Sequence, residues 1–491
     1  MQVGDRSIER TGFAPTVAQR WDRRDLSLVG LLVAAVCAVG WRLRHCYGDD
    51  ALIVLRYAHN LLVGEGWVYN HGESINAATS PLHVLFTALL GALCGDLEIA
   101  LPLTFVVPFA ACVVMVYQLA RPYGRRAAFF AALLATFAPR LYATMGMETP
   151  LVLATGLGAC FAFVAGRPTL SGALCGLAVL ARPDAALLAL LLAGCAARTG
   201  RSAFARFGAA GVVVAAPWFA YAWLTFGSPL PSTLAMKLAQ RSVHGSGPIF
   251  LHGAWGEVRR FAGAFGSTWL VVVVALLAVA ALVLCVRARR HRVLALFCTF
   301  AVLQFGCYAI GNLPPFHWYY GPAFFAVSLA AGVAVVEAFA SRRTVLEGIA
   351  IAAATLIVVV AVPEVARPER PHDHYRVLGL WLRENTPADA SVALAEIGIA
   401  GYHALPRPIV DMVGLVTPGG AGPIAAGDTG WWFDRHRPDY IVFHEPVWTP
   451  FEAPAMRRAA FEQQYRLLPV SLPGPGLSIY QRIEPPATAP R

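Results

Sequence analysis

The chain is organised by a repeated alternation between apolar segments and short basic connections. About eleven apolar segments follow one another between residues 26 and 362, and two of them, 169–181 and 185–197, are shorter than a full membrane span. The segments are 26–43, 98–120, 127–138, 151–166, 169–181, 185–197, 207–226, 267–286, 293–311, 322–340 and 345–362. Of the 491 residues, 57% are hydrophobic and 14% are charged, whereas a soluble globular protein carries roughly a quarter charged residues. The pattern predicts a polytopic α-helical membrane protein.

The basic connections predict which side of the membrane each segment faces, because cytoplasmic loops carry an excess of Lys and Arg. Four arginine-rich stretches are predicted to be cytoplasmic: 1–25, 121–126, 198–206 and 287–292. The apolar run 26–43 lacks a convincing small-residue cleavage site and is predicted to stay as the first membrane helix. By the same alternation, the loop 44–97 and the C-terminal residues 363–485 are predicted to lie outside the cytoplasm.

The net charge of +10 comes largely from these connections. A basic soluble protein would suggest a nucleic-acid partner, but here the topological explanation is sufficient and no nucleic acid is expected. Nine of the ten cysteines lie in apolar segments, without the spacing of a zinc site or a disulfide framework. They are interpreted as small buried hydrophobic residues.

Residues 363–485 differ from the rest of the chain because their charge density is higher and their hydropathy lower. The run 375–385 has helical periodicity, and four short segments have strand character between turn signals: 391–397, 408–414, 439–444 and 477–483. We expect a small α/β domain here, followed by a disordered tail at 486–491.

Two adjacent carboxylates, Asp49 and Asp50, open the first outer loop. Residues 51–63 are predicted to form a helix along the membrane interface, with the two acids at its N-terminus, where the helix dipole favours carboxylates. The segment 81–93 is too short to span and is expected to be interfacial or re-entrant. Asp49 and Asp50 could simply cap the helix. We favour a catalytic role, because two acids stand together at the mouth of a membrane bundle.

Other ionisable or hydroxyl-bearing residues on the predicted outer side are further candidates, since such groups are costly near a membrane unless they have a function. They are Glu148, Arg182, Asp184, Lys237, His317, Tyr319 and Tyr320. Each also has a structural interpretation. In this interpretation Glu148 would begin a helix, and Arg182 and Asp184 would pair with each other across a turn. Lys237 would be solvated, and the His317–Tyr320 stretch would form an aromatic belt.

Together these groups suggest a transfer reaction. An ionised Asp can take a proton from an attacking hydroxyl as a general base. Basic groups such as Lys237 and Arg182, with hydroxyls such as Tyr319, can hold a departing phosphate. No P-loop, Rossmann fingerprint or GxSxG elbow stands in a supporting context.

Six motifs occur in a recognisable order: GDDALIVLRYAHNLLVGEGWVYNHGES, METPL, ARPDAALL, GSPLPSTLAMK, HWYY and VDMVGLVTP. The series resembles the GT-C superfamily of integral-membrane glycosyltransferases, which use polyprenyl-phosphate sugars as donors. It is most similar to the actinobacterial terminal arabinofuranosyltransferase type, which uses decaprenyl-phospho-arabinose. The resemblance runs from about residue 49 to residue 418, and the acidic pair is its most specific element.

The resemblance implies a GT-C-like bundle with its active site at the first outer loop of a bacterial inner-membrane protein. Asp49 or Asp50 would be the catalytic base of an inverting transfer to a cell-wall glycan or glycolipid acceptor. The remaining candidates would bind substrate: Glu148, Arg182, Asp184, Lys237, His317, Tyr319 and Tyr320. Some members need a divalent cation (Mg, Mn or Ca) and others do not, and the two acids leave this open.

Two other functions fit the same composition. A transporter or flippase for a lipid-linked sugar would favour internal repeats and charges near mid-membrane, whereas here no convincing repeat is seen and the polar residues gather on one side. A non-catalytic envelope scaffold would use the C-terminal domain to bind glycan and would tolerate replacement of Asp49 and Asp50.

Overall fold

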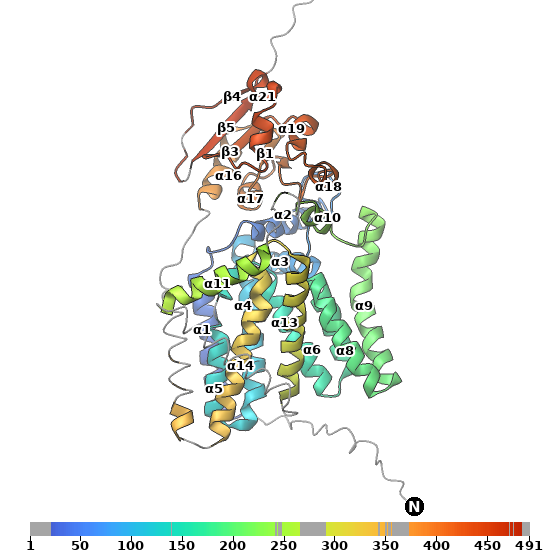
Figure 1. The fold of residues 1–491 in the computed structure, drawn as a ribbon, viewed down its shortest axis with the longest axis vertical. Coiled ribbons are helices and arrows are strands. Elements are labelled where there is room, and N and C mark those ends of the chain that lie inside the picture. The colour runs from blue at the N-terminus through green and yellow to red at the C-terminus, as the bar shows by residue number, and fades with distance from the viewer. Residues whose placement is uncertain are drawn as a thin grey trace, which may run out of the picture.

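The structure is a computed structural model. It describes residues 21–138, 140–240, 243, 248–265, 291–341, 344–348, 351, 355, 373–470, 472–474 and 476–483. Figure 1 shows two parts, a bundle of long helices and a smaller domain that contains a sheet and lies over one end of the bundle. Short helices lie between the two parts, and α2 and α10 are among them.

Nine of the predicted spans coincide with helices of the bundle. These are α1 (Arg23–Arg42), α4 (Leu97–Ala120), α5 (Arg125–Thr136), α6 (Thr149–Val164), α7 (Pro168–Ala181), α8 (Ala186–Thr199), α9 (Arg201–Phe226), α13 (Arg292–Gly311) and α14 (Gly321–Ala340). Five helices in the described part of the chain are long and apolar enough to cross a membrane. The predicted spans 267–286 and 345–362 lie wholly or largely outside the described residues, so the number eleven stays a prediction.

The bundle core is formed by apolar side chains from all nine of these helices. Aromatic rings meet edge to face at its centre, with Phe325 against Phe109 and Phe297. Elsewhere small residues permit close helix approach, as is common in membrane proteins. A Cβ atom added at Gly172 of α7 would lie 2.0 Å from the carbonyl oxygen of Phe207 in α9.

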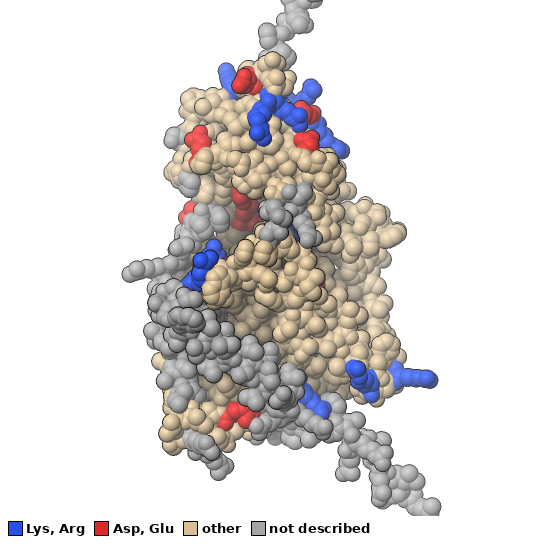
Figure 2. Space-filling model, viewed as in Figure 1, with Lys and Arg blue, Asp and Glu red and all other residues tan. Residues whose placement is uncertain are grey.

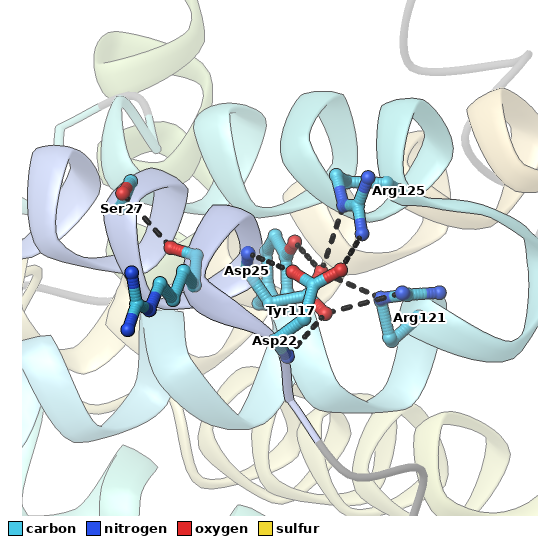
Figure 3. Close-up of polar contacts among 7 residues, drawn as sticks. Asp22, Asp25, Ser27, Tyr117, Arg121 and Arg125 are labelled. Atoms are coloured by element: carbon cyan, nitrogen blue, oxygen red, sulfur yellow. Dashed lines mark hydrogen bonds and ion pairs between the residues drawn. The ribbon is translucent and has the colours of Figure 1, made fainter.

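An ionic cluster lies at the end of the bundle away from the C-terminal domain (Figure 3). Asp25 of α1 is fully buried and accepts hydrogen bonds from Arg121 Nε at 2.7 Å and Tyr117 Oη at 2.8 Å. Arg125 of α5 contacts both Asp25 and the exposed Asp22. Asp22 also caps α1 by accepting from the Asp25 N–H at 2.9 Å. The cluster therefore ties the first helix to α4 and α5.

Four further helices stand at the opposite end, towards the C-terminal domain: α2 (Asp50–Leu62), α3 (Pro81–Cys94), α10 (Ser232–Ala239) and α11 (Ile249–Phe265). The prediction of a helix over 51–63 is confirmed by α2. The connection that follows α9 contains α10 and α11, for which the sequence analysis gave no prediction. Both helices are amphipathic, which explains why a search for continuous apolar spans does not detect them.

The C-terminal domain has a five-stranded sheet of order β2-β1-β3-β5-β4. Its strands are β1 (Val392–Leu394), β2 (Ile409–Asp411), β3 (Tyr440–His444), β4 (Tyr465–Leu467) and β5 (Leu477–Arg482). β1 pairs in parallel with β2 and β3, and β5 pairs antiparallel with β3 and β4. The helices are α16 (Asp373–Asn385), α17 (Ile399–His403), α18 (Ala421–Ala425), α19 (Trp431–His436), α20 (Ala453–Met456) and α21 (Ala459–Gln464).

One apolar core continues from the first loop into this domain. Leu55 and Tyr57 of α2 are fully buried in the same cluster as Leu378 of α16 and Ile399 of α17. Such shared burial excludes water from the boundary and stabilises the domain against α2. The C-terminal domain is thus packed directly on the loop that carries the two acids.

Candidate active site

Asp49 and Asp50 lie at the start of α2 but face different partners. Asp49 is 9% exposed and its side chain makes no capping hydrogen bond to α2. Instead its two carboxylate oxygens accept from the backbone N–H groups of Gly398 at 2.6 Å and Ile399 at 2.7 Å. Asp49 therefore satisfies the free N–H groups at the start of α17 in the C-terminal domain. The capping alternative is wrong for α2, and the helix that Asp49 caps is α17.

The contact between Asp49 and the C-terminal domain requires glycine at position 398. A Cβ atom added there would lie 1.8 Å from the backbone oxygen of Asp49, far inside van der Waals contact. At the same boundary, the Tyr69 hydroxyl donates to the carbonyl of Ile397 at 2.7 Å. The segment 397–399 is therefore held against α2 by its own backbone groups.

Arg56 is a second link between α2 and the C-terminal domain. Its side chain is 1% exposed, stacks on the Tyr69 ring at 4.5 Å and donates to the Tyr69 and Arg407 carbonyls, both at 2.8 Å. It also donates to the carbonyl of Gly401. Backbone oxygens thus disperse a buried charge, because a buried guanidinium must find acceptors for its N–H groups. Sequence analysis did not single out Arg56.

Asp50 is in a different position from Asp49. It is only partly exposed, and within the described residues its carboxylate accepts no hydrogen bond. Burial raises the pKa of Asp50, and the positive charge of Lys237 on α10 opposes the rise. Asp50 therefore has free lone pairs and a nearby cation, so it can accept a proton from a ligand.

Arg182 lies at the turn between α7 and α8 and is the centre of a polar network. Its Nε and Nη2 atoms donate to the two oxygens of Asp184 at 3.1 and 3.0 Å. Nη2 also donates to the Tyr308 hydroxyl at 2.9 Å, and Nη1 lies 3.5 Å from Glu148 Oε1. The pairing that the sequence suggested for Arg182 and Asp184 is present. It is one part of a larger network that also holds Glu148.

Lys237 joins this network through Tyr319. Its Nζ atom donates to the Tyr319 hydroxyl at 2.6 Å and lies 5.2 Å from the centre of that ring, and the Arg182 guanidinium lies 5.2 Å from the same ring centre. An ammonium has three N–H donors, and within the described residues only one is used. Lys237 can therefore bind an anion without breaking its contact with Tyr319.

The structure thus brings most predicted site residues into one region. Glu148, Arg182, Asp184, Lys237 and Tyr319 are linked by the contacts above, and Asp50 is linked to them by the charge of Lys237.

His317 and Tyr320 have different partners. His317 Nε2 lies 2.8 Å from the carbonyl oxygen of Ala143, and the Tyr320 hydroxyl donates to the carbonyl of Phe250 at 2.8 Å.

Three residues near the network were not predicted: Gln304, Tyr308 and Glu396. Gln304 Nε2 and the Tyr308 hydroxyl each lie 2.9 Å from Asp184 Oδ2. A buried glutamine in an apolar segment is itself a signal for function or pairing and could have identified α13. Glu396 belongs to the C-terminal domain, and no local pattern in the sequence relates it to Asp50.

The donor set gives little basis for a metal site. Among the residues that the structure describes, no group of three or more His, Cys, Asp or Glu side chains is arranged to hold an ion. Asp49, one of the two acids considered for this role, directs both oxygens at backbone N–H groups. The divalent cation stays a prediction, and no step below is routed through one.

Known proteins resemble this chain both in sequence and in fold. Residues 80–311 match the model of glycosyltransferase family 87, and residues 366–481 match a domain of unknown function, DUF8728. Among solved structures, ArnT from Cupriavidus metallidurans bound to undecaprenyl phosphate aligns with a TM-score of 0.61 at 16% identity, over 95% of this chain and 99% of ArnT. The arabinofuranosyltransferase AftD from mycobacteria aligns with a TM-score of 0.51 at 15% identity, over 95% of this chain and 40% of AftD.

The fold is therefore that of the GT-C membrane glycosyltransferases, in a multi-pass membrane protein. In sequence, the chain is similar to the terminal beta-(1->2)-arabinofuranosyltransferases. It is 36% identical to that of Mycobacterium tuberculosis over 202 residues, which cover 35% of this chain and 32% of the relative. It is 34% identical to that of Corynebacterium glutamicum over 166 residues, covering 31% and 24%. The matches span about a third or less of these relatives, and they confirm the resemblance predicted from the motifs.

Proposed function

We propose that the protein transfers a sugar from a polyprenyl-phosphate donor to a cell-envelope glycan or glycolipid, on the outer face of the bacterial cell membrane. The family match and the arabinofuranosyltransferase relatives support the reaction class, and arabinofuranose is the sugar that this similarity favours. The undecaprenyl phosphate bound to ArnT supports a lipid-linked donor. The observation that carries the proposal is the position of Asp50, which starts α2 beneath the C-terminal domain and whose carboxylate accepts no hydrogen bond from the described residues. The positive charge of Lys237 acts on this carboxylate.

In the proposed reaction, Asp50 takes the proton of an acceptor hydroxyl. The acceptor oxygen forms a bond to the anomeric carbon while the bond from that carbon to the phosphate oxygen breaks, so the configuration at the carbon is inverted. The electron pair leaves with the polyprenyl phosphate. Lys237 stabilises the charge that develops on this leaving group, because its unused N–H groups are already in place.

The other polar residues position these two. Arg182 directs its donors to Asp184, Tyr308 and the Trp318 carbonyl, which leaves it little capacity to hold a phosphate on its own. Its role is to fix Glu148 and the face of Tyr319, and through Tyr319 the ammonium of Lys237. Preorganisation of this kind reduces the reorganisation needed in the transition state.

The test is transfer of labelled sugar from a synthetic polyprenyl-phosphate arabinofuranose to an arabinan oligosaccharide by the purified full chain. The proposal predicts a glycosylated product and released polyprenyl phosphate in equal amounts. In parallel, proteoliposomes measure movement of the labelled donor between leaflets. Scrambling of the donor without any transfer would overturn the proposal in favour of a flippase.

A further inference from the structure

Glu396 of the C-terminal domain stands at the same boundary as the two acids of the first loop. It follows β1 and lies two residues before Gly398, whose N–H group donates to Asp49. The backbone carbonyl of the next residue, Ile397, accepts a hydrogen bond from the Tyr69 hydroxyl. The backbone around Glu396 is therefore fixed against α2. Figure 2 shows acidic side chains in a hollow between the C-terminal domain and the bundle.

The Glu396 carboxylate has no hydrogen bond or ion pair within the described residues, and its side chain is only partly exposed. Its acidic neighbours in the domain are fully buried and satisfied. Asp411 accepts from the N–H groups of Val413 at 2.8 Å and Val416 at 3.0 Å. Glu452 accepts from the backbone N–H group of Trp448 at 2.7 Å. Structural acids in this domain are thus hydrogen-bonded, and Glu396 differs from them.

Hydrogen bonds join three side chains of the same domain, Glu452, His444 and Tyr375. Glu452 Oε1 lies 2.5 Å from His444 Nδ1, and His444 Nε2 lies 2.8 Å from the Tyr375 hydroxyl. Tyr375 in turn interacts electrostatically with Glu396 and Asp49. None of these three residues takes part in the reaction described above. A chain of titratable groups that is electrostatically coupled to a carboxylate without a hydrogen-bond partner among the described residues is a further sign of a functional position.

The charge around Glu396 is mainly negative. Burial raises the pKa of Glu396 to about 7, the charge of Asp50 adds to the rise, and His444 opposes it. The titratable groups that face it are Asp49, Asp50, Tyr375, Asp411, His444 and Glu452. Such surroundings repel a phosphate, whereas a carboxylate accepts strong hydrogen bonds from neutral hydroxyl groups.

We propose that Glu396 binds a hydroxyl group of the acceptor sugar, so that the acceptor lies between the C-terminal domain and Asp50. The proposal rests on the proposed function and divides the site in two. Lys237 of α10, with the Arg182 network at the end of the bundle, holds the donor phosphate. Glu396 of the C-terminal domain holds the neutral, hydroxyl-rich acceptor. The C-terminal domain then supplies a residue to the reaction centre.

The experiment measures KM for the arabinan acceptor, KM for the donor, and kcat, at pH 6 and pH 8. The proteins are wild type, Glu396→Gln, and the control Glu384→Gln, which alters an exposed acid of the same domain. With its pKa near 7, Glu396 is mostly protonated at pH 6 and mostly ionised at pH 8. The acceptor KM of wild type should therefore fall as the pH rises. In Glu396→Gln it should stay flat and exceed the wild-type value about tenfold at pH 8.

The donor KM should be the same in all three proteins, and Glu384→Gln should follow wild type throughout. A purely structural role of Glu396 would instead lower kcat at both pH values. If wild type transfers sugar but Glu396→Gln keeps the wild-type acceptor KM at pH 8, the acceptor assignment is wrong and the proposed function stands. If wild type transfers no sugar, the proposed function itself fails.

Discussion

Two neighbouring acids of the same chemical type have different surroundings here. Asp49 uses both oxygens to bind backbone N–H groups of the C-terminal domain. Asp50 accepts no hydrogen bond within the described residues, and the positive charge of Lys237 opposes the rise in its pKa that burial causes. The geometry thus assigns a structural role to Asp49 and leaves Asp50 available to a ligand, a distinction that adjacency in the sequence cannot make.

The first prediction concerns Asp49→Asn. The amide keeps the size of the side chain but replaces one acceptor oxygen with an NH₂ group, which meets a backbone N–H donor. A buried backbone N–H group left without an acceptor costs about 1–3 kcal/mol, so we expect the free energy of unfolding to fall by about that amount. The measurement is thermal or denaturant unfolding in detergent. Asp50→Asn is the matched variant and should unfold like wild type, so equal destabilisation by both changes would contradict the assignment.

How much of the site the sequence reveals depends on where its residues lie. The sequence singled out Asp49 and Asp50 because they are adjacent and polar beside an apolar segment. It singled out Arg182 and Asp184 because they flank a proline in a turn. Glu396 could not be predicted as a site residue, because only the folded chain brings it near the two acids of the first loop. The segments that pack together here are about 350 positions apart, as in the contact between Asp49 and Gly398. Arg56 is hidden for the same reason.

At the scale of elements, the junction of α2 with α17 depends on the absence of a side chain at Gly398. Gly398→Ala would place a methyl group against the backbone of Asp49, and such overpacking costs typically about 1–3 kcal/mol. We expect a lower unfolding temperature and faster proteolysis of the C-terminal domain. Gly422→Ala is the control, because an added Cβ atom there has no neighbour within 4 Å. Equal resistance of the two variants to protease would show that the junction is not tight.

The ionic cluster of α1, α4 and α5 gives a second prediction at this scale (Figure 3). Asp25→Asn leaves Arg121 and Arg125 without their buried counter-charge, and breaking a buried pair costs about 3–5 kcal/mol. Asp22→Asn, at a half-exposed position, should cost about 1 kcal/mol or less. Unfolding curves of the two variants in the same detergent make the comparison. A larger loss for Asp22→Asn would contradict the account of this cluster.

Helices and strands with a strong hydrophobic pattern could be predicted from the sequence, whereas short or amphipathic elements could not. Long apolar runs between arginine clusters correspond to bundle helices, and four strand segments of the C-terminal domain coincide with β1, β2, β3 and β5. β4 was missed because it has three residues, two of them exposed, so no alternation can be read from it. α10 and α11 were missed because each buries one face against the rest of the protein and has no long apolar run.

At the scale of the whole molecule, the arrangement explains why the C-terminal domain belongs to the enzyme that we propose. The bundle supplies Arg182 and the network around it, α10 supplies Lys237, and the first loop supplies Asp50. The domain covers both, and its apolar core is continuous with α2. A separate glycan-binding module would need no such continuity, so we expect the two parts to act as one unit.

The most direct test of the central claim is the rate of transfer by Asp50→Asn in the labelled-donor assay. A general base contributes about 10²–10⁴-fold to the rate. The account predicts that kcat falls at least about 100-fold, while binding of polyprenyl phosphate and the unfolding temperature match wild type. Transfer by Asp50→Asn at the wild-type rate would contradict the claim that this carboxylate takes the proton.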